Sequence, residues 1–289
     1  MRAEVIAMAC SLPVEQGVPL SRWSASELAR EVVARGIVEQ ISGLTVWRWL
    51  SQDAIRPWQH RSWIFPRDPS FAERAGPILD LYAGVWEGER LHPGDYVICA
   101  DEKPSIQTRE RIHATLPARP GEGQKVEHEY QRKGALCYLA AWDARRAKIF
   151  DRCAPKHGIK PFDALVDQFM SQHPYRSAQR VFLIIDNGSA HRGKRSIDRL
   201  TGTWPNMTVV HTPIHASWLN QAEIYFSVIQ RKVVTPNDFA DLDTLQAHLL
   251  AFSRRYEQIA EPFEWKFTRH DLHKLLLKTD TPDPASLAA

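Results

Sequence analysis

Two apolar runs that each end at an aspartate constrain the fold of this chain more than any other feature. Tyr96–Ala100 is followed by Asp101, and Val181–Ile185 is followed by Asp186. A short apolar run of this kind is typical of a buried strand, and a carboxylate just past its end lies at a sheet edge that faces a cleft. The sequence therefore predicts a sheet with two carboxylates at one edge.

A third acidic residue, Glu223, lies in segment 217–226, whose pattern indicates the start of a helix. Three carboxylates that converge from separate elements can hold two divalent cations about 4 Å apart. Each acid alone has a simpler explanation, because an Asp after a strand is often a turn residue and a helical Glu is usually solvated. Together, Asp101, Asp186 and Glu223 are the candidate catalytic residues and the candidate ligands of two Mg²⁺ ions, for which Mn²⁺ would substitute.

The order of the expected elements after residue 94 predicts an α/β fold with a mixed sheet flanked by helices. Three strands come first, and strands and helices alternate after them. The stretch 107–133 carries six Lys or Arg against four acids, and we expect a mobile loop over the active-site face that touches DNA backbone. The expected strands are 96–100, 135–142, 148–153, 181–185 and 207–211, and the expected helices are 161–173, 194–200, 221–234, 242–258 and 270–278.

The N-terminal region reads as two short helices joined by a turn. Ser24 and Glu27 form a capping box, Gly36 ends the first helix, and 42–50 forms the second. This is the plan of a helix-turn-helix, whose second helix can enter the major groove of DNA, although plain helical packing explains it equally well. Thr45 and Arg48 would face outward. We therefore expect a DNA-binding region at 1–67, a linker at 68–93 and a catalytic domain with C-terminal helices at 94–289.

Arginine is concentrated where DNA contact is expected. The net charge of +3 is too small to prove a nucleic-acid partner, but 44–67 holds four Arg against one Asp, interleaved with Trp. Guanidinium groups in such a stretch can contact DNA phosphate. A Trp-rich core that carries many Arg explains the same pattern equally well. A basic turn after Asp186, which includes His191, suits a scissile phosphate. The DNA-binding candidates are Thr45, Arg48, Arg56, Arg61, Arg192, Lys194 and Arg195.

Three polar residues beside the acids are expected to support them. Asn187 and His191 follow Asp186, and Asn220 lies three residues before Glu223, on roughly the same helical face. The bulk composition, 44% hydrophobic and 25% charged, is that of a soluble globular protein. The four cysteines form no CxxC pair, which disfavours a structural zinc site and favours reduced thiols in the cytoplasm.

Three blocks of the sequence, taken together, resemble the catalytic blocks of bacterial insertion-sequence transposases of the group numbered 630, which is related to the mariner elements. They are 97–107 (VICADEKPSIQ), 182–192 (FLIIDNGSAHR) and 215–226 (HASWLNQAEIYF). The stretch 23–50 also resembles that group's helix-turn-helix region. The resemblance implies an RNase H-like core in which Asp101, Asp186 and Glu223 bind the metals. It further implies cleavage at element ends, transfer of the 3′-hydroxyl into target DNA at TA, and action as a homodimer on DNA near the nucleoid.

Two features depart from that group's pattern. The stretch between Asp186 and Glu223 is 36 residues long (187–222), slightly more than in typical mariner-type members. Full-length members also carry a further N-terminal helical unit, so we expect this chain to be a downstream or truncated portion whose end-specific binding stays open. Two other readings remain: a metal-dependent nuclease of the same fold without strand transfer, and a catalytically silent DNA-binding remnant.

Overall fold

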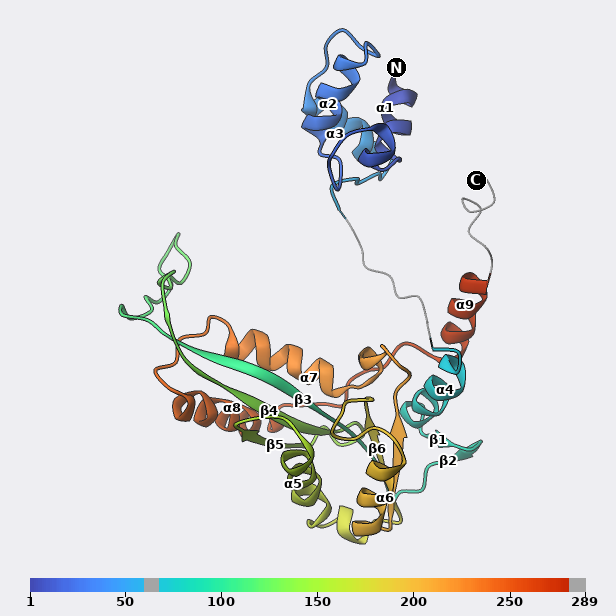
Figure 1. Ribbon diagram of the computed structural model, residues 1–289, viewed down its shortest axis with the longest axis vertical. Helices are drawn as coiled ribbons and strands as arrows, with labels where there is room; N and C mark the ends of the chain where they lie inside the picture. The colour runs from blue at the N-terminus through green and yellow to red at the C-terminus, as the bar shows by residue number, and fades with distance from the viewer. Residues whose placement is uncertain (60–67, 281–289) are drawn as a thin grey trace. The chain divides into compact units, whose positions relative to one another are not determined.

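The computed structural model describes residues 1–59 and 68–280, and the chain divides into two compact units, Met1–Phe65 and Pro66–Ala289. The first unit packs three α-helices and a 3₁₀ turn around one small core (Figure 1). Its elements are α1 (Arg2–Ala9), η1 (Pro13–Gln16), α2 (Ala25–Ala34) and α3 (Gly43–Gln52). The capping box predicted from Ser24 and Glu27 is present at the start of α2. Val46 and Leu50 of α3 are buried, whereas Arg48 is exposed.

A five-stranded mixed sheet forms the centre of the second unit, with strand order β5-β4-β3-β6-β7. β3 pairs antiparallel with β4 and β4 with β5, whereas β6 runs parallel to β3 and β7 parallel to β6. The predicted succession of three strands followed by alternating helices and strands is therefore present. The strands are β3 (Asp95–Glu110), β4 (Gln131–Asp143), β5 (Ile149–Ala154), β6 (Arg180–Ile185) and β7 (Met207–His211).

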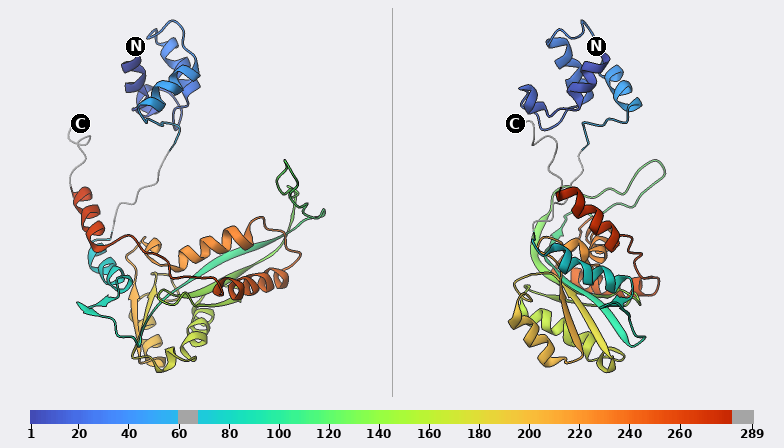
Figure 2. Two further views of the ribbon diagram at one scale, coloured as in Figure 1. Left: turned by 180° about the vertical axis from the view of Figure 1, so that it is seen from behind. Right: turned by 90° about the vertical axis from the view of Figure 1, so that its right-hand side faces the viewer.

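Helices cover both faces of this sheet (Figure 2). Alternate side chains of a strand point to opposite faces, so the apolar runs supply two cores. Val97 and Cys99 face one core and Ile98 faces the other. α4 (Phe71–Tyr82), α7 (Ala222–Ile229) and α8 (Leu242–Glu257) cover the face of Val97. α5 (Ile159–Met170) and α6 (Lys194–Thr203) cover the face of Ile98, and shorter turns η2 (Tyr175–Ser177), η3 (Ser217–Leu219) and the π-helical η4 (Gln230–Val234) connect the elements.

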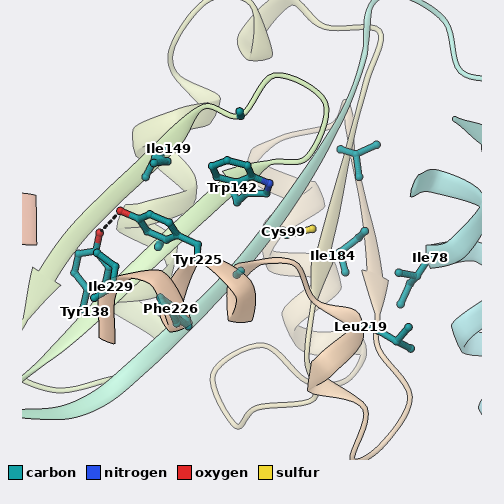
Figure 3. Packing of buried hydrophobic residues seen from close by; sticks show 14 of the residues in the cluster. Ile78, Cys99, Tyr138, Trp142, Ile149, Ile184, Leu219, Tyr225, Phe226 and Ile229 are labelled. Atoms are coloured by element: carbon teal, nitrogen blue, oxygen red, sulfur yellow. Dashed lines mark hydrogen bonds between the residues drawn. The ribbon is translucent and has the colours of Figure 1, made fainter. Parts of the chain in front are cut away.

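Aromatic side chains fill the core beneath α7. Trp142 of β4 stacks on Tyr225 of α7 with ring centroids 6.2 Å apart, and the Tyr138 and Tyr225 hydroxyls lie 3.1 Å apart (Figure 3). All three side chains are fully buried. Because large aromatic rings pack with specific geometry, they fix α7 against the sheet.

The segment 68–93, expected to be a linker with one helical stretch near 71–82, is largely structured within the second unit, and the expected helix is present. It forms α4 and a small hairpin of β1 (Val85–Trp86) and β2 (Glu89–Arg90). Phe71, Ile78 and Leu81 of α4 are buried in the same cluster as Val97. The apolar face of α4 thus belongs to the core of the second unit, which begins near residue 66 rather than at 94.

The stretch expected to be a loop, 107–133, is instead the outer part of a long antiparallel arm. β3 continues to Glu110, β4 begins at Gln131, and bridges Leu116–Lys125 and Arg119–Glu122 order the tip (Figure 1). Cross-strand backbone pairing outweighs the polar composition of the stretch. The last helix, α9 (Arg269–Asp280), packs on α4, and Arg269 forms a bidentate ion pair with Asp80 at 2.6 Å. Within the described ranges, no helix has the length and hydropathy to cross a bilayer.

Candidate active site

Asp101 lies within β3, on the face covered by α7. It is 7% exposed, and its Oδ1 accepts a 2.7 Å hydrogen bond from the backbone N–H of Glu102. Burial, together with the neighbouring carboxylates of Asp186 and Glu223, raises the pKa of Asp101 to about 8. The strand continues for nine residues beyond Asp101, because the arm extends it, so this acid lies on the sheet rather than past a strand end.

Asp186 directly follows β6, as predicted, and its carboxylate is held by two donors. Oδ1 accepts the backbone N–H of Gly188 at 2.7 Å and also contacts Nε2 of His191. The His191 contact is the main cause that lowers the pKa of Asp186. β6 runs parallel to β3 and is hydrogen-bonded to it, so the backbone pairing itself brings Asp186 beside the strand of Asp101.

Glu223 lies in the first turn of α7, and Asn220 connects this turn to β3. The Asn220 side chain is fully buried, its Nδ2 donates to the carbonyl of Ala100 at 2.9 Å, and its Oδ1 accepts from the N–H of Ala222 at 3.1 Å. Both bonds are internal and shielded from water. Asn220 therefore positions the helix of Glu223 against the residue that precedes Asp101.

The three acids come from three separate elements and interact electrostatically, since Asp186 and Glu223 both raise the pKa of Asp101. Within the described part of the chain, no group of three His, Cys, Asp or Glu side chains is placed so that it could hold a metal ion. The chemistry of the three acids nevertheless suits divalent cations, because carboxylates are hard oxygen ligands and a cation would offset the repulsion that Asp186 and Glu223 exert on Asp101.

The other two predicted supporting residues, Asn187 and His191, make internal contacts. Asn187 donates from Nδ2 to the carbonyl of Thr212 at 2.6 Å, which connects the end of β6 to the end of β7. His191 is fully buried, with its ring 4.6 Å from that of Phe162, so it does not join the exposed basic turn in holding a phosphate. Its Nδ1 lies 3.9 Å from Oε2 of Glu102, and neither atom has a hydrogen-bond partner.

Tyr82 and Asp68, which the sequence pattern does not single out, position the approach to α7. The Tyr82 hydroxyl of α4 donates to the carbonyl of Leu219 at 2.7 Å, and Oδ2 of Asp68 accepts the N–H of Ile214 at 3.0 Å. Both lie in the segment expected to be a linker. Only a local signal existed for them, an Asp before a helix and a Tyr on its apolar face, and neither reveals a partner more than 130 positions away.

The candidate DNA-binding residues fall into two groups, one in each unit. In the first unit Arg48 and Arg56 are exposed and Thr45 is half-buried, with its N–H capped by Ser42 at 3.2 Å. Arg61 lies outside the described residues. In the second unit Arg192, Lys194 and Arg195 are exposed around the start of α6, directly after the Asp186 turn.

Solved structures of a transposase share this fold. The Mos1 transposase paired-end complex with left transposon end matches with a TM-score of 0.54 and 14% identity, over 97% of this chain and 76% of that one. The Mos1 mariner paired-end complex with Mn matches with a TM-score of 0.54 and 14% identity, over 97% and 77%. The corresponding complex with Mg matches with a TM-score of 0.53 and 14% identity, over 97% of this chain and 77% of that one. These likenesses confirm the predicted RNase H-like fold.

One of two sequence comparisons identifies the family. No curated protein matches the chain. The sequence model described as DDE superfamily endonuclease matches residues 96–246, which is more than half of the 289 residues and includes Asp101, Asp186 and Glu223. The chain therefore belongs to the DDE superfamily endonuclease family.

Proposed function

We propose that the chain is a DDE transposase, or the catalytic portion of one, that cuts DNA at the ends of an insertion sequence and joins the 3′-hydroxyls to target DNA. The observation that carries the proposal is the electrostatic coupling of three carboxylates that β3, the end of β6 and α7 bring to one face of the sheet. Carboxylates from separate elements suit phosphodiester chemistry, because the scissile phosphate and two cations must fit between them.

Asp101, Asp186 and Glu223 would hold two Mg²⁺ ions, or Mn²⁺ in their place. Bound there, such ions activate the attacking water or 3′-hydroxyl and stabilise the leaving oxygen. The chain's own residues set the geometry: the Gly188 N–H and His191 orient Asp186, and Asn220 holds the helix of Glu223 against β3. The Mn and Mg contents of the similar Mos1 complexes support this assignment.

Double-stranded DNA is the proposed partner, and the transposon end in a similar Mos1 complex supports it. We further propose membership of the bacterial group numbered 630, insertion at TA, action as a homodimer on DNA and a place with the nucleoid in the cytoplasm. α3 would present Thr45 and Arg48 to duplex DNA, with Arg56 nearby, and Arg192, Lys194 and Arg195 would lie beside the substrate phosphates.

The direct test is cleavage and strand transfer on duplexes that carry candidate element ends, in Mg²⁺ and in Mn²⁺. We expect nicked and joined products with the wild-type chain and none with Asp186→Asn. Asp243→Asn is the matched control, because it removes the same charge from an exposed position on α8 and should leave activity unchanged. Hydrolysis without joining would favour a nuclease, and metal-independent binding without products would favour a silent remnant.

A further inference from the structure

The base of the β3–β4 arm holds two adjoining cavities that the proposed chemistry does not use. One has a volume of about 550 Å³ and the other about 360 Å³, and they share Arg109, Gln230 and Asn237 in their walls. Together they form a continuous hollow along the arm, which we call the arm groove. The cationic residues that line it are Lys103, Arg109, Arg111 and Arg132.

Two arginines face each other across the arm without a neutralising acid. Arg109 and Arg132 are directly opposite in the β3–β4 register. Among the described residues neither forms an ion pair, and the buried Nε of Arg109 has no hydrogen-bond partner. Like charges in directly opposed positions of a sheet are destabilising. An anion bound between the two guanidinium groups would offset this repulsion.

Glu127 itself lines the groove, and Oδ1 of Asp238 lies 3.9 Å from Nη1 of Arg111, but the acids in and beside the groove have partners other than Arg109 and Arg132. Glu110 pairs with Lys133 at 2.9 Å. Glu127 accepts the backbone N–H groups of Ile112 and His113 at 3.0 and 2.9 Å. Neither acid contacts Arg109 or Arg132, so the positive charge of the pair remains open to a ligand.

The groove is built rigidly, as a preformed binding site requires. Arg111, with its side chain 8% exposed, donates from Nε to the carbonyl of Glu127 at 2.7 Å and from Nη1 to that of Asn237. Asn237 in turn accepts the N–H of Arg109 at 2.9 Å and donates to the carbonyl of Gln107 at 2.5 Å. The guanidinium of Arg109 lies 4.6 Å from the centroid of the Tyr130 ring, which orients it.

We propose that the arm groove binds the sugar–phosphate backbone of a DNA duplex that runs from the three acids along the arm, an inference that rests on the proposed function. Guanidinium groups match phosphate geometry, and the groove lies on the same strand as Asp101. Arg109 follows Asp101 by eight residues, so a strand rise of about 3.3 Å per residue puts it at most about 26 Å away. At 3.4 Å per base pair, the phosphates that Arg109 contacts lie within about eight base pairs of the scissile bond.

The experiment measures duplex binding by the full chain in Ca²⁺, where cutting is not expected, as a function of salt. The slope of log Kobs against log salt is negative, and each phosphate contact contributes about 0.9 to its magnitude. Arg109→Gln combined with Arg132→Gln should therefore make the slope shallower by about 1.8. Lys133→Gln is the matched control, because it removes a charge from the next residue of the arm, where Glu110 already neutralises it. The control should keep the wild-type slope.

Position along the DNA provides the second readout. Neutral methylphosphonates placed one at a time should weaken wild-type binding at a position within about eight base pairs of the scissile bond, and the double variant should be insensitive there. Duplexes that end before this point should bind both proteins equally. Arg132→Gln alone, at an exposed position, keeps the test valid if the Arg109 change disturbs folding.

The possible failures are distinguishable. A wild-type chain that binds no duplex would overturn the proposed function itself. A double variant with the same slope and the same methylphosphonate profile as Lys133→Gln, in a chain that binds and cuts DNA, would overturn only the assignment of the arm groove.

Discussion

The side-chain amide of Asn220 donates a 2.9 Å hydrogen bond to the carbonyl oxygen of Ala100. Ala100 directly precedes Asp101 in β3, and Asn220 directly precedes the turn that places Glu223 in α7. The two acids lie on elements that are far apart in the sequence, yet one buried amide fixes their backbones to each other. This bond links the start of the helix to the sheet at the candidate active site.

Replacing Asn220 with alanine should reduce cleavage by about 10–100-fold, because a misplacement of about 1 Å has that effect on a reacting group. It should also cost about 1–3 kcal/mol of stability, since the Ala100 carbonyl is left buried without a donor. Asn206→Ala is the control. The side-chain amide of Asn206 likewise donates to backbone carbonyls, those of Tyr175 and Ala178, but it lies on a connection away from the acids. Similar losses of activity in both variants would refute a positioning role for Asn220.

Gly188→Ala should impair cleavage with little loss of stability. A Cβ at this position would lie 2.9 Å from both Oδ1 of Asp186 and Nε2 of His191, so the pair must separate. Gly202→Ala is the control, because nothing lies within 4 Å of its added Cβ and alanine in α6 should stabilise by about 0.5–1 kcal/mol. The measurement is cleavage rate together with thermal melting, and full activity of Gly188→Ala would show that the His191 contact is dispensable.

The stability of the metal-free chain should fall as pH rises from about 4 to 8. The pKa of Asp101 is raised from its ordinary value of 3.8 to about 8, so folding disfavours its ionisation throughout this range. Asp101→Asn removes that cost and should stabilise the chain at pH 8, with little gain at pH 4. Denaturant unfolding in EDTA measures this, and Asp243→Asn should show no such pH-dependent gain.

Divalent cations should bind the three acids together rather than singly. Mg²⁺ or Mn²⁺ should raise the melting temperature of the wild-type chain, because a cation bound to the native state stabilises it. Asp101→Asn, Asp186→Asn and Glu223→Gln should each weaken this shift and abolish cleavage. Ca²⁺ should support DNA binding without cutting. Robust cutting in EDTA would eliminate the two-metal mechanism.

Arg48→Ala should weaken binding to duplex DNA and leave the chemistry of bound substrate unchanged, because Arg48 is exposed on α3 and lies far along the chain from the acids. Losing one phosphate contact should make the slope of log Kobs against log salt shallower by about 0.9. Arg30→Ala removes the same charge from an exposed position on α2 and should have a smaller effect. Equal affinities of the two variants would argue against α3 as the recognition helix.

The sequence by itself determined the strands and most of the helices. The apolar runs before Asp101 and Asp186 are strands, and the capped segments 25–34 and 43–52 are helices, because hydrophobic period and caps are local properties. The same runs indicated that Asp186 follows a strand. The arm was not predicted, because its polar residues show no hydrophobic periodicity. Pairing with the opposite strand decides their structure.

Only the tertiary structure decided what surrounds the acids. Parallel pairing of β3 and β6 brings Asp186 beside Asp101, and the raised pKa of Asp101 comes first from its burial and then from both other acids. His191 reads as part of a basic turn, but folding buries it against Asp186. Tyr82 reads as part of a linker, but it hydrogen-bonds to Leu219. Such contacts depend on burial and chain crossing, which arise only when distant segments pack together and therefore leave no local pattern in the sequence.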